Sequence, residues 1–322
     1  MKSFISGIVI VLVLGSLFFT AGCKNKGALS VSHSAQADTS VEMRVGILPT
    51  MDCLPAVYAL KNGIFDSLGV HVQLVPYSSA MDCDTAFINR HIDGMFTDVV
   101  RGILMNTRQN CKIVMSTPAE WGLFSNKNIR LKRLPQIKER TIALARHSAT
   151  DFLSDYICEK TAIEEDEIHR PQINDIQLRL KMLSNNQIDL AFLPQPQASM
   201  AKAMGNRKLF STGEEHLKLG ALVFSTDYIK KKAAMRRLQL FVRGYDEACK
   251  LLKNKKAVGV KNILVQDFQV PETLVDSIAI PAYQPYSLPE KKDIGAVNAW
   301  LQKRKLVSSS LLTDTCFLSV NS

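Results

Sequence analysis

From residue 44 onward, the sequence alternates between short apolar stretches with a strand pattern and longer stretches with a helical pattern. The first apolar stretch ends before Pro49, and the first helical stretch ends at Asn62-Gly63, a pair that commonly stops a helix. The predicted strands are residues 44–48, 70–74, 92–97 and 112–116, and the predicted helices between them are residues 54–61, 83–90 and 99–108. This βαβαβαβ order predicts an α/β fold with a parallel sheet and helices on both faces.

The same alternation then starts again. Further strands are predicted at residues 141–145, 172–173, 188–193 and 221–225, and further helices near residues 152–157, 175–183, 197–204, 233–253, 258–266, 271–278 and 289–304. Residues 89–96 and 185–192 share Asn, Ile, Asp and Phe at equivalent positions, and each stretch ends a helix and begins a strand. The repetition predicts two similar, doubly wound α/β lobes.

The chain is expected to pass between these lobes twice, near residues 116–122 and 212–220. Two crossings predict a hinge, and a hinge between α/β lobes predicts a cleft that closes. The predicted divisions are a signal peptide at 1–22, a tether at 23–42, lobe one at 43–117 with 217–322, and lobe two at 118–216.

The N-terminus has the pattern of an export signal. Lys2 precedes an apolar run at residues 4–19, and Thr20-Ala21-Gly22-Cys23 follows it. A cysteine directly after Ala-Gly is typical of a lipoprotein signal, although Thr20 stands where Leu is usual. We therefore expect Cys23 to carry lipid, and the protein to be anchored in the cell envelope, outside the cytoplasm. The alternative is an ordinary cleaved signal or an N-terminal anchor, with Cys23 incidental.

Composition narrows the class of protein further. Hydrophobic residues make up 46% of the 322 residues and charged residues 22%, which is typical of a globular chain. The net charge of +10 is carried partly by clusters at 230–232, 236–237 and 253–256, which predict a solvated face or, alternatively, contact with anionic lipid. We do not expect nucleic acid as a partner, because the protein is expected to be exported and because its basic clusters are not interleaved with aromatic residues. We expect a monomer.

Sequence motifs for catalysis or metal binding are not recognisable. The cysteines and histidines have no zinc-site spacing, and no nucleotide-binding loop, Ser/His/Asp set or paired-carboxylate motif is present. We expect no cofactor, no metal and no enzymatic activity.

Four phrases carry a resemblance to a known family. They are residues 44–49 (RVGILP), 61–65 (KNGIF), 92–98 (IDGMFTD) and 187–196 (QIDLAFLPQP). In this order and spacing, they resemble the ABC-transporter solute-binding lipoproteins of the nitrate, sulfonate and thiamine-pyrimidine group. The resemblance covers roughly residues 44–209 and extends more loosely to the C-terminus.

The resemblance implies a type II periplasmic-binding fold. A small-molecule ligand would bind between the lobes and pass to an ABC permease, but the ligand's identity is not implied. Two alternatives remain open: a pyrimidine-precursor synthase-like enzyme on the same fold, and a ligand-sensing surface lipoprotein.

Candidate ligand contacts follow the carboxyl ends of the predicted strands, where ligands bind in open parallel sheets. The candidates are Thr50, Met51, Asp52, Ser78, Ser79, Thr97 and Asp98 in lobe one, Ser148, Thr150 and Gln195 in lobe two, and Trp121 at the first crossing. The hydroxyl and carboxylate side chains could instead cap helices. The acidic residues slightly favour a pyrimidine-like ligand over a bare anion, and a sulfonate or similar solute stays open.

A repeated Met-Asp-Cys triplet occurs at residues 51–53 and 81–83, after two strands predicted to be neighbours. We expect a disulfide between Cys53 and Cys83 that braces the cleft wall. Soft ligands for a metal, or two buried reduced thiols, are the alternatives.

Overall fold

The computed structural model describes residues 42–253, 258–308 and 313–320. The predicted signal peptide, Cys23 and all but the last residue of the tether lie outside the described residues. Within the described ranges, no helix combines the length and apolar character needed to span a bilayer.

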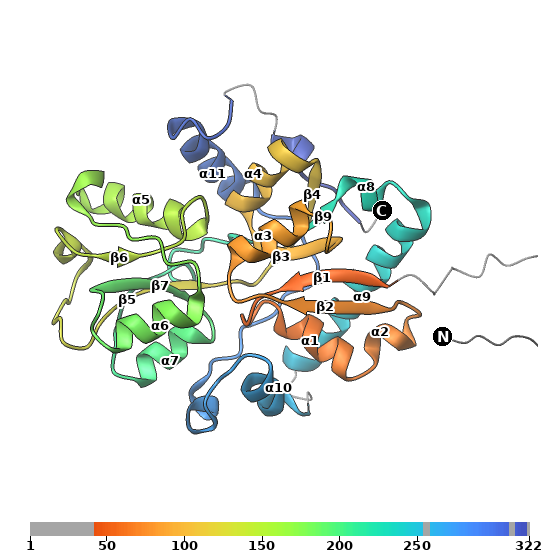
Figure 1. Ribbon diagram of the computed structural model, residues 1–322, viewed down its shortest axis with the longest axis horizontal. Helices are drawn as coiled ribbons and strands as arrows, with labels where there is room; N and C mark the ends of the chain where they lie inside the picture. Colours follow the sequence, from red (N-terminus) through yellow and green to blue (C-terminus); the bar gives the residue numbers. More distant parts are fainter. Residues whose placement is uncertain (1–41, 254–257, 309–312, 321–322) are drawn as a thin grey trace, which may run out of the picture. The chain divides into compact units, whose positions relative to one another are not determined.

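Lobe one is built on a five-stranded sheet with strand order β2-β1-β3-β9-β4 (Figure 1). The strands are β1 (Met43–Ile47), β2 (Val72–Pro76), β3 (Gly94–Asp98), β4 (Cys111–Thr117) and β9 (Gly220–Ser225). β1 pairs in parallel with β2 and β3, but β9 is antiparallel to both β3 and β4. The predicted all-parallel sheet is therefore wrong at one position, because the strand that returns from lobe two is inserted in the opposite direction.

Helices cover both faces of this sheet. They are α1 (Leu54–Lys61), α2 (Ile64–Ser67), α3 (Ala80–Ile88), α4 (Val99–Gln109), α8 (Thr226–Ile229), α9 (Lys232–Lys253), α10 (Val260–Gln266) and α11 (Lys291–Lys303), with short 3-10 turns η3 (Glu272–Ser277) and η4 (Thr313–Cys316). On one face α1, α2 and α9 share a core in which the rings of Phe65 and Phe241 stack at 5.0 Å. On the other face α3, α4 and α11 pack into a second core.

Lobe two contains a four-stranded sheet with strand order β6-β7-β5-β8. Its elements are β5 (Trp121–Ser125), η1 (Leu134–Ile137), β6 (Ile142–Ala143), α5 (Ala149–Thr161), η2 (Glu165–Glu167), α6 (Ile176–Ser184), β7 (Leu190–Pro194), α7 (Gln197–Ala203) and β8 (Arg207–Ser211). β6 and β7 are parallel, whereas β5 is antiparallel to β7 and β8. The strand predicted at 172–173 is only an isolated bridge between Leu144 and Gln172.

The chain passes between the lobes twice, from β4 into β5 and from β8 into β9. A third connection is non-covalent. Helix α11 packs on α4 of lobe one, while Trp300 Nε1 (2.7 Å) and Arg304 Nε (2.8 Å) both donate to Asp155 Oδ2 in α5 of lobe two. The Asp155 side chain is 2% exposed and also pairs with Arg170 at 2.9 Å.

The predicted disulfide between Cys53 and Cys83 is not formed, and both residues are buried free thiols. Cys53 packs in the core shared by α1 and α9, and Cys83 packs in the core on the opposite face of the sheet. Gly46 of β1 leaves room for Cys83, since a Cβ at this position would lie 2.5 Å from its Sγ. The sheet therefore separates the two thiols, and the alternative of two buried thiols describes them.

Candidate functional site

A cavity of about 60 Å³ lies between the two lobes, beside the carboxyl ends of β1 and β3. Lobe one contributes Leu48, Thr50, Asp52, Ala80, Phe96, Thr97, Asp98 and Arg101; Ala119 lies in the first crossing; and lobe two contributes Trp121, Ala145, Ser148, Thr150, Asn174, Ile176, Arg179 and Pro194. The cavity lies where the fold places ligands, and residues from both lobes close it.

Seven of the predicted contact residues line this cavity together: Thr50, Asp52, Thr97, Asp98, Trp121, Ser148 and Thr150. They come from strand ends, helix starts and loops that are far apart in the sequence. Alternation of strands and helices was enough to place them at one edge of each sheet.

The other four predicted residues do not line it. Met51 is 1% exposed within the core, and its carbonyl accepts a hydrogen bond from Tyr283. Ser79 caps α3 by accepting from Asp82 N, and Ser78 is exposed. Gln195 Oε1 accepts from Ser199 Oγ at 2.8 Å and lies at a different hollow, described below.

The cavity also contains two arginines that sequence reasoning missed, Arg101 and Arg179, which are 7% and 3% exposed. Both lie inside helices, α4 and α6, whereas the prediction considered only the loops after strands. Their position within otherwise apolar helical faces was the signal that could have identified them, because an arginine is rarely fully buried without a partner.

Arg101 is compensated by nearby carboxylates. It pairs with Asp84 of α3, and its Nε lies 3.8 Å from Asp98 Oδ2. Asp98 also caps α4, accepting from Arg101 N at 2.9 Å. Burial raises the pKa of Asp98 to about 6, although the charge of Arg101 opposes this shift.

Arg179 is less well compensated than Arg101. Its Nη1 donates to the Phe192 carbonyl at 2.7 Å, but no carboxylate of the described residues forms an ion pair with it. Burial, followed by the neighbouring charge of Arg101, lowers the pKa of Arg179 to about 10, while the charge of Asp175 opposes the shift. A guanidinium so desolvated is costly unless an anionic group joins it.

Asp52 is the opposite case. It is 5% exposed and accepts a hydrogen bond from Thr117 Oγ1 at 3.1 Å, yet no cation in the described part of the chain pairs with it. Burial raises the pKa of Asp52, while hydrogen bonds from Thr50 and Thr117 oppose the shift.

Several buried polar atoms of cavity-lining residues lack a hydrogen-bond partner among the described residues. They are Thr97 Oγ1, Arg101 Nε and Arg179 Nε. Buried polar groups are nearly always paired in folded proteins, so this concentration at one cavity indicates a place for a polar guest or ordered water.

Hydrogen bonds between the lobes surround the cavity. Met51 N donates to the Gln195 carbonyl at 2.9 Å, Gln197 Nε2 donates to the Pro49 carbonyl at 3.0 Å, and Arg101 Nη2 donates to the Arg146 carbonyl at 3.4 Å. In this conformation the lobes are in contact. A volume of 60 Å³ has room for about four to six water-sized groups.

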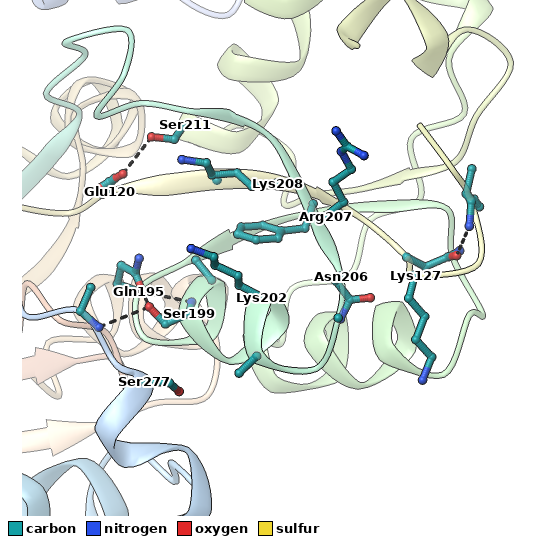
Figure 2. Close-up of a pocket in the computed structure, with 18 of the residues that line it drawn as sticks. Glu120, Lys127, Gln195, Ser199, Lys202, Asn206, Arg207, Lys208, Ser211 and Ser277 are labelled. Atoms are coloured by element: carbon teal, nitrogen blue, oxygen red, sulfur yellow. Dashed lines mark hydrogen bonds between the residues drawn. The ribbon is translucent and has the colours of Figure 1, made fainter. Parts of the chain in front are cut away.

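A second and larger hollow lies on lobe two beside η3, with a volume of about 1010 Å³ (Figure 2). We call it the basic groove, because exposed cations line it: Lys127, Arg130, Lys132, Lys202, Arg207 and Lys208. Figure 2 shows two pairs of its other polar groups joined by hydrogen bonds, Ser211 with Glu120 and Gln195 with Ser199. An open, solvated groove offers less selectivity for a small solute than the enclosed cavity does.

Metal binding has no support in the described ranges, where no group of three or more His, Cys, Asp or Glu side chains could hold an ion.

No protein-family model and no curated protein sequence matches the chain. Solved structures do resemble it. The alkanesulfonate-binding protein SsuA from Xanthomonas axonopodis pv. citri, bound to MOPS, has a TM-score of 0.72 at 17% identity, covering 86% of this chain and 98% of that one. The ligand-binding component of an ABC-type import system from Staphylococcus aureus, with zinc bound, has a TM-score of 0.71 at 14% identity, with coverages of 86% and 96%.

The nitrate-binding protein NrtA from Synechocystis PCC 6803 has a TM-score of 0.69 at 13% identity, covering 85% of this chain and 84% of that one. An enzyme shares the fold as well: the desulfurization enzyme DSZB has a TM-score of 0.62 at 11% identity. The sulfonate-binding and nitrate-binding proteins among them are of the kind that the sequence resemblance implied. At such identities they establish the two-lobed type II periplasmic-binding fold.

Proposed function

We propose that this protein is an extracytoplasmic solute-binding protein, which captures a small polar solute between its lobes and delivers it to an ABC importer. The observation that carries the proposal is Arg179, a buried guanidinium without an anionic partner, in the wall of a cavity that both lobes close. The solute would supply the missing anionic group.

The position of the cavity supports binding coupled to closure. Asp52, Thr97 and Asp98 belong to lobe one, whereas Ser148, Thr150 and Arg179 belong to lobe two. A solute that contacts both sets is satisfied only when the lobes are together, so it would favour the closed state. Proteins of similar fold are named as a ligand-binding component of an ABC-type import system and as an alkanesulfonate-binding protein, which agrees with this function.

The cavity changes the expected solute. A pyrimidine-like ligand was slightly favoured by the acidic loops, but two guanidinium groups and a volume of about 60 Å³ favour a smaller solute with an anionic group.

A ligand screen tests the proposal. The full-length protein, purified in mild detergent and dialysed exhaustively, is heated with nitrate, alkanesulfonates, amino acids, small carboxylates and pyrimidines. A true ligand at 100 times its Kd adds about 2.7 kcal/mol to the free energy of unfolding. If no compound of these classes raises the melting temperature, solute capture by this cavity is contradicted.

Anchoring is part of the same proposal. The Ala21-Gly22-Cys23 signal ending supports lipidation of Cys23, with the protein facing outward from a membrane. Lys24 rather than Asp follows, which favours the periplasmic face of the outer membrane in a Gram-negative cell. Replacing Cys23→Ala should abolish lipid-dependent processing and membrane attachment in cell fractionation. Unchanged processing and attachment in the variant would refute lipidation.

A further inference from the structure

Two buried groups of opposite charge line the same cavity, and neither forms an ion pair with any residue that the structure describes. Asp52 is a carboxylate without a cation, at the start of α1 in lobe one. Arg179 is a guanidinium without an anion, in α6 of lobe two. The two belong to different lobes, and each is more than nine-tenths buried.

The cavity as a whole is close to electrically neutral. Its ionisable lining consists of Asp52, Asp98, Arg101 and Arg179, whose formal charges cancel. Asp84, which pairs with Arg101 from outside the lining, adds one negative charge. With Asp84 the formal total is −1, so an anionic solute would add a second negative charge, whereas a cationic solute would leave Arg179 without an anion. Either outcome is costly in a desolvated site.

We propose that the solute is a compact zwitterion, whose carboxylate or sulfonate group is bound by Arg179 and whose ammonium group is bound by Asp52 and Asp98. This inference rests on the proposed function and names the substrate class of that site. Each end of the solute supplies the charge that one lobe lacks, so the solute links the lobes electrostatically.

The size of the cavity limits how far apart the two charges lie. A volume of 60 Å³ corresponds to about four to six non-hydrogen atoms. That number allows one or two carbons between the ammonium and acid groups, as in glycine or β-alanine. The hydroxyl of Thr97, which has no hydrogen-bond partner among the described residues, is available to the same solute.

Single-charge solutes satisfy only half of this site. Acetate, nitrate or methanesulfonate would pair with Arg179 but would bring a negative charge toward Asp52 and Asp98. Methylammonium would pair with the carboxylates and leave Arg179 alone. Both classes are expected to bind more weakly than the zwitterion that combines them.

Calorimetric titration of the full-length protein in mild detergent tests the proposal with glycine, β-alanine and aminomethanesulfonate against acetate, propionate, nitrate, methanesulfonate and methylammonium. We expect the best zwitterion to bind at least about 30-fold more tightly than its single-charge fragments, the loss typical of removing one partner of a buried charge pair. If a bare anion binds as tightly as every zwitterion, the zwitterion proposal is overturned while solute capture stands. If none of the zwitterions binds, the zwitterion proposal is likewise overturned.

The Asp52→Asn variant tests the contact with the ammonium group separately from the contact with the anionic group. It should weaken zwitterion binding by about 30-fold or more, while leaving acetate and propionate affinity unchanged or raised. Asp276→Asn is the matched control, because its side chain is 82% exposed and far less desolvated. Equal losses for zwitterions and for bare anions in Asp52→Asn would mean that the change damaged the fold, which unfolding curves check. With folding intact, equal losses contradict the ammonium contact.

The pH dependence gives an independent readout. Asp98 is faced by Arg101 of its own helix, by Asp84 of α3 and by the N–H of Ala149 in α5. Its carboxylate is ionised above its pKa of about 6 and attracts an ammonium group, so zwitterion affinity should fall as the pH drops from about 7.5 to about 5. Affinity for a bare anion should rise over the same range. A zwitterion affinity that rises on acidification would contradict the assignment.

Discussion

The inter-lobe cavity and the basic groove both carry cationic side chains, but they differ in what surrounds those charges. The groove has six exposed lysines and arginines around about 1010 Å³, and Lys208 among them pairs with Glu214 at 2.5 Å. The cavity has only two arginines around about 60 Å³, and both are buried. The groove cations are exposed to solvent, whereas the buried guanidinium of Arg179 donates a hydrogen bond to the carbonyl of Phe192.

The difference shows that burial, rather than the number of charges, identifies the stronger site for a small charged solute. An exposed ion pair contributes about 0–1 kcal/mol, because water and salt screen it. A buried charge that gains its first partner recovers part of a desolvation penalty of several kcal/mol. The predictions below compare the two regions directly.

The largest effect is expected from Arg179→Met. Solute affinity should fall by about 30-fold or more, because the anionic group would enter a buried site without its cation. The unliganded protein should be as stable as the parent or more stable, since an apolar side chain replaces an uncompensated charge. Calorimetric titration and urea unfolding measure the two quantities.

Arg207→Met is the matched control, since Arg207 lines the basic groove and is exposed. Its affinity for the solute should be within about twofold of the parent value. If both variants lose affinity equally, the distinction between cavity and groove is wrong.

An intermediate effect is expected from Thr150→Ala. The Thr150 hydroxyl is buried and already accepts a hydrogen bond from Ala145 N at 3.0 Å, and it contacts Ser148 Oγ at 2.9 Å. Its loss should lower the free energy of unfolding by about 1–2 kcal/mol and weaken solute binding only a few-fold. Thr85→Ala, on the exposed surface of α3, provides the control for loss of a threonine hydroxyl. A loss of affinity as large as in Arg179→Met would show that Thr150 contacts the solute directly.

The smallest effect is expected when three groove cations are neutralised together, as Lys127→Gln, Lys202→Gln and Arg207→Gln. At physiological salt the Debye length is about 8 Å, so exposed charges have little influence on a buried solute. Solute affinity in calorimetry should stay within about twofold of the parent. A loss of tenfold or more would indicate that the groove belongs to the site.

Much of the fold follows from sequence periodicity. The helix predicted at 54–61 is α1 with the same ends, and the helix predicted at 99–108 is α4 within one residue. The antiparallel insertion of β9 was not predictable, because the pattern of an apolar strand does not record its direction. β5 was also missed, since its first two residues fall within the predicted crossing at 116–122, where Pro118 and Gly122 indicate a loop.

The site was predictable to the extent that it lies at or soon after the carboxyl ends of strands, as for Asp52, Asp98 and Thr150. Helix position alone did not indicate that Arg179 turns toward the cavity, because this depends on how α6 packs against β7. The prediction of a disulfide between Cys53 and Cys83 was wrong for a related reason. The helices that follow two neighbouring strands begin at the same edge of the sheet. Their side chains meet only if both helices pack on the same face, and Cys53 and Cys83 lie in the cores on opposite faces.

The contact between α11 and α5 also constrains how the protein could release a solute. A hinge at the two chain crossings alone would let the lobes swing apart freely, but Asp155 of α5 also binds Trp300 and Arg304 at the C-terminal end of α11. Opening must either pivot at this contact, which keeps the swing small, or detach it and expose a carboxylate that is now 2% exposed. The first route gives a limited aperture suited to a small solute, and the second gives a wide aperture with a high barrier. Release through a wide opening would therefore be slow unless another protein supplied the energy to separate the helices.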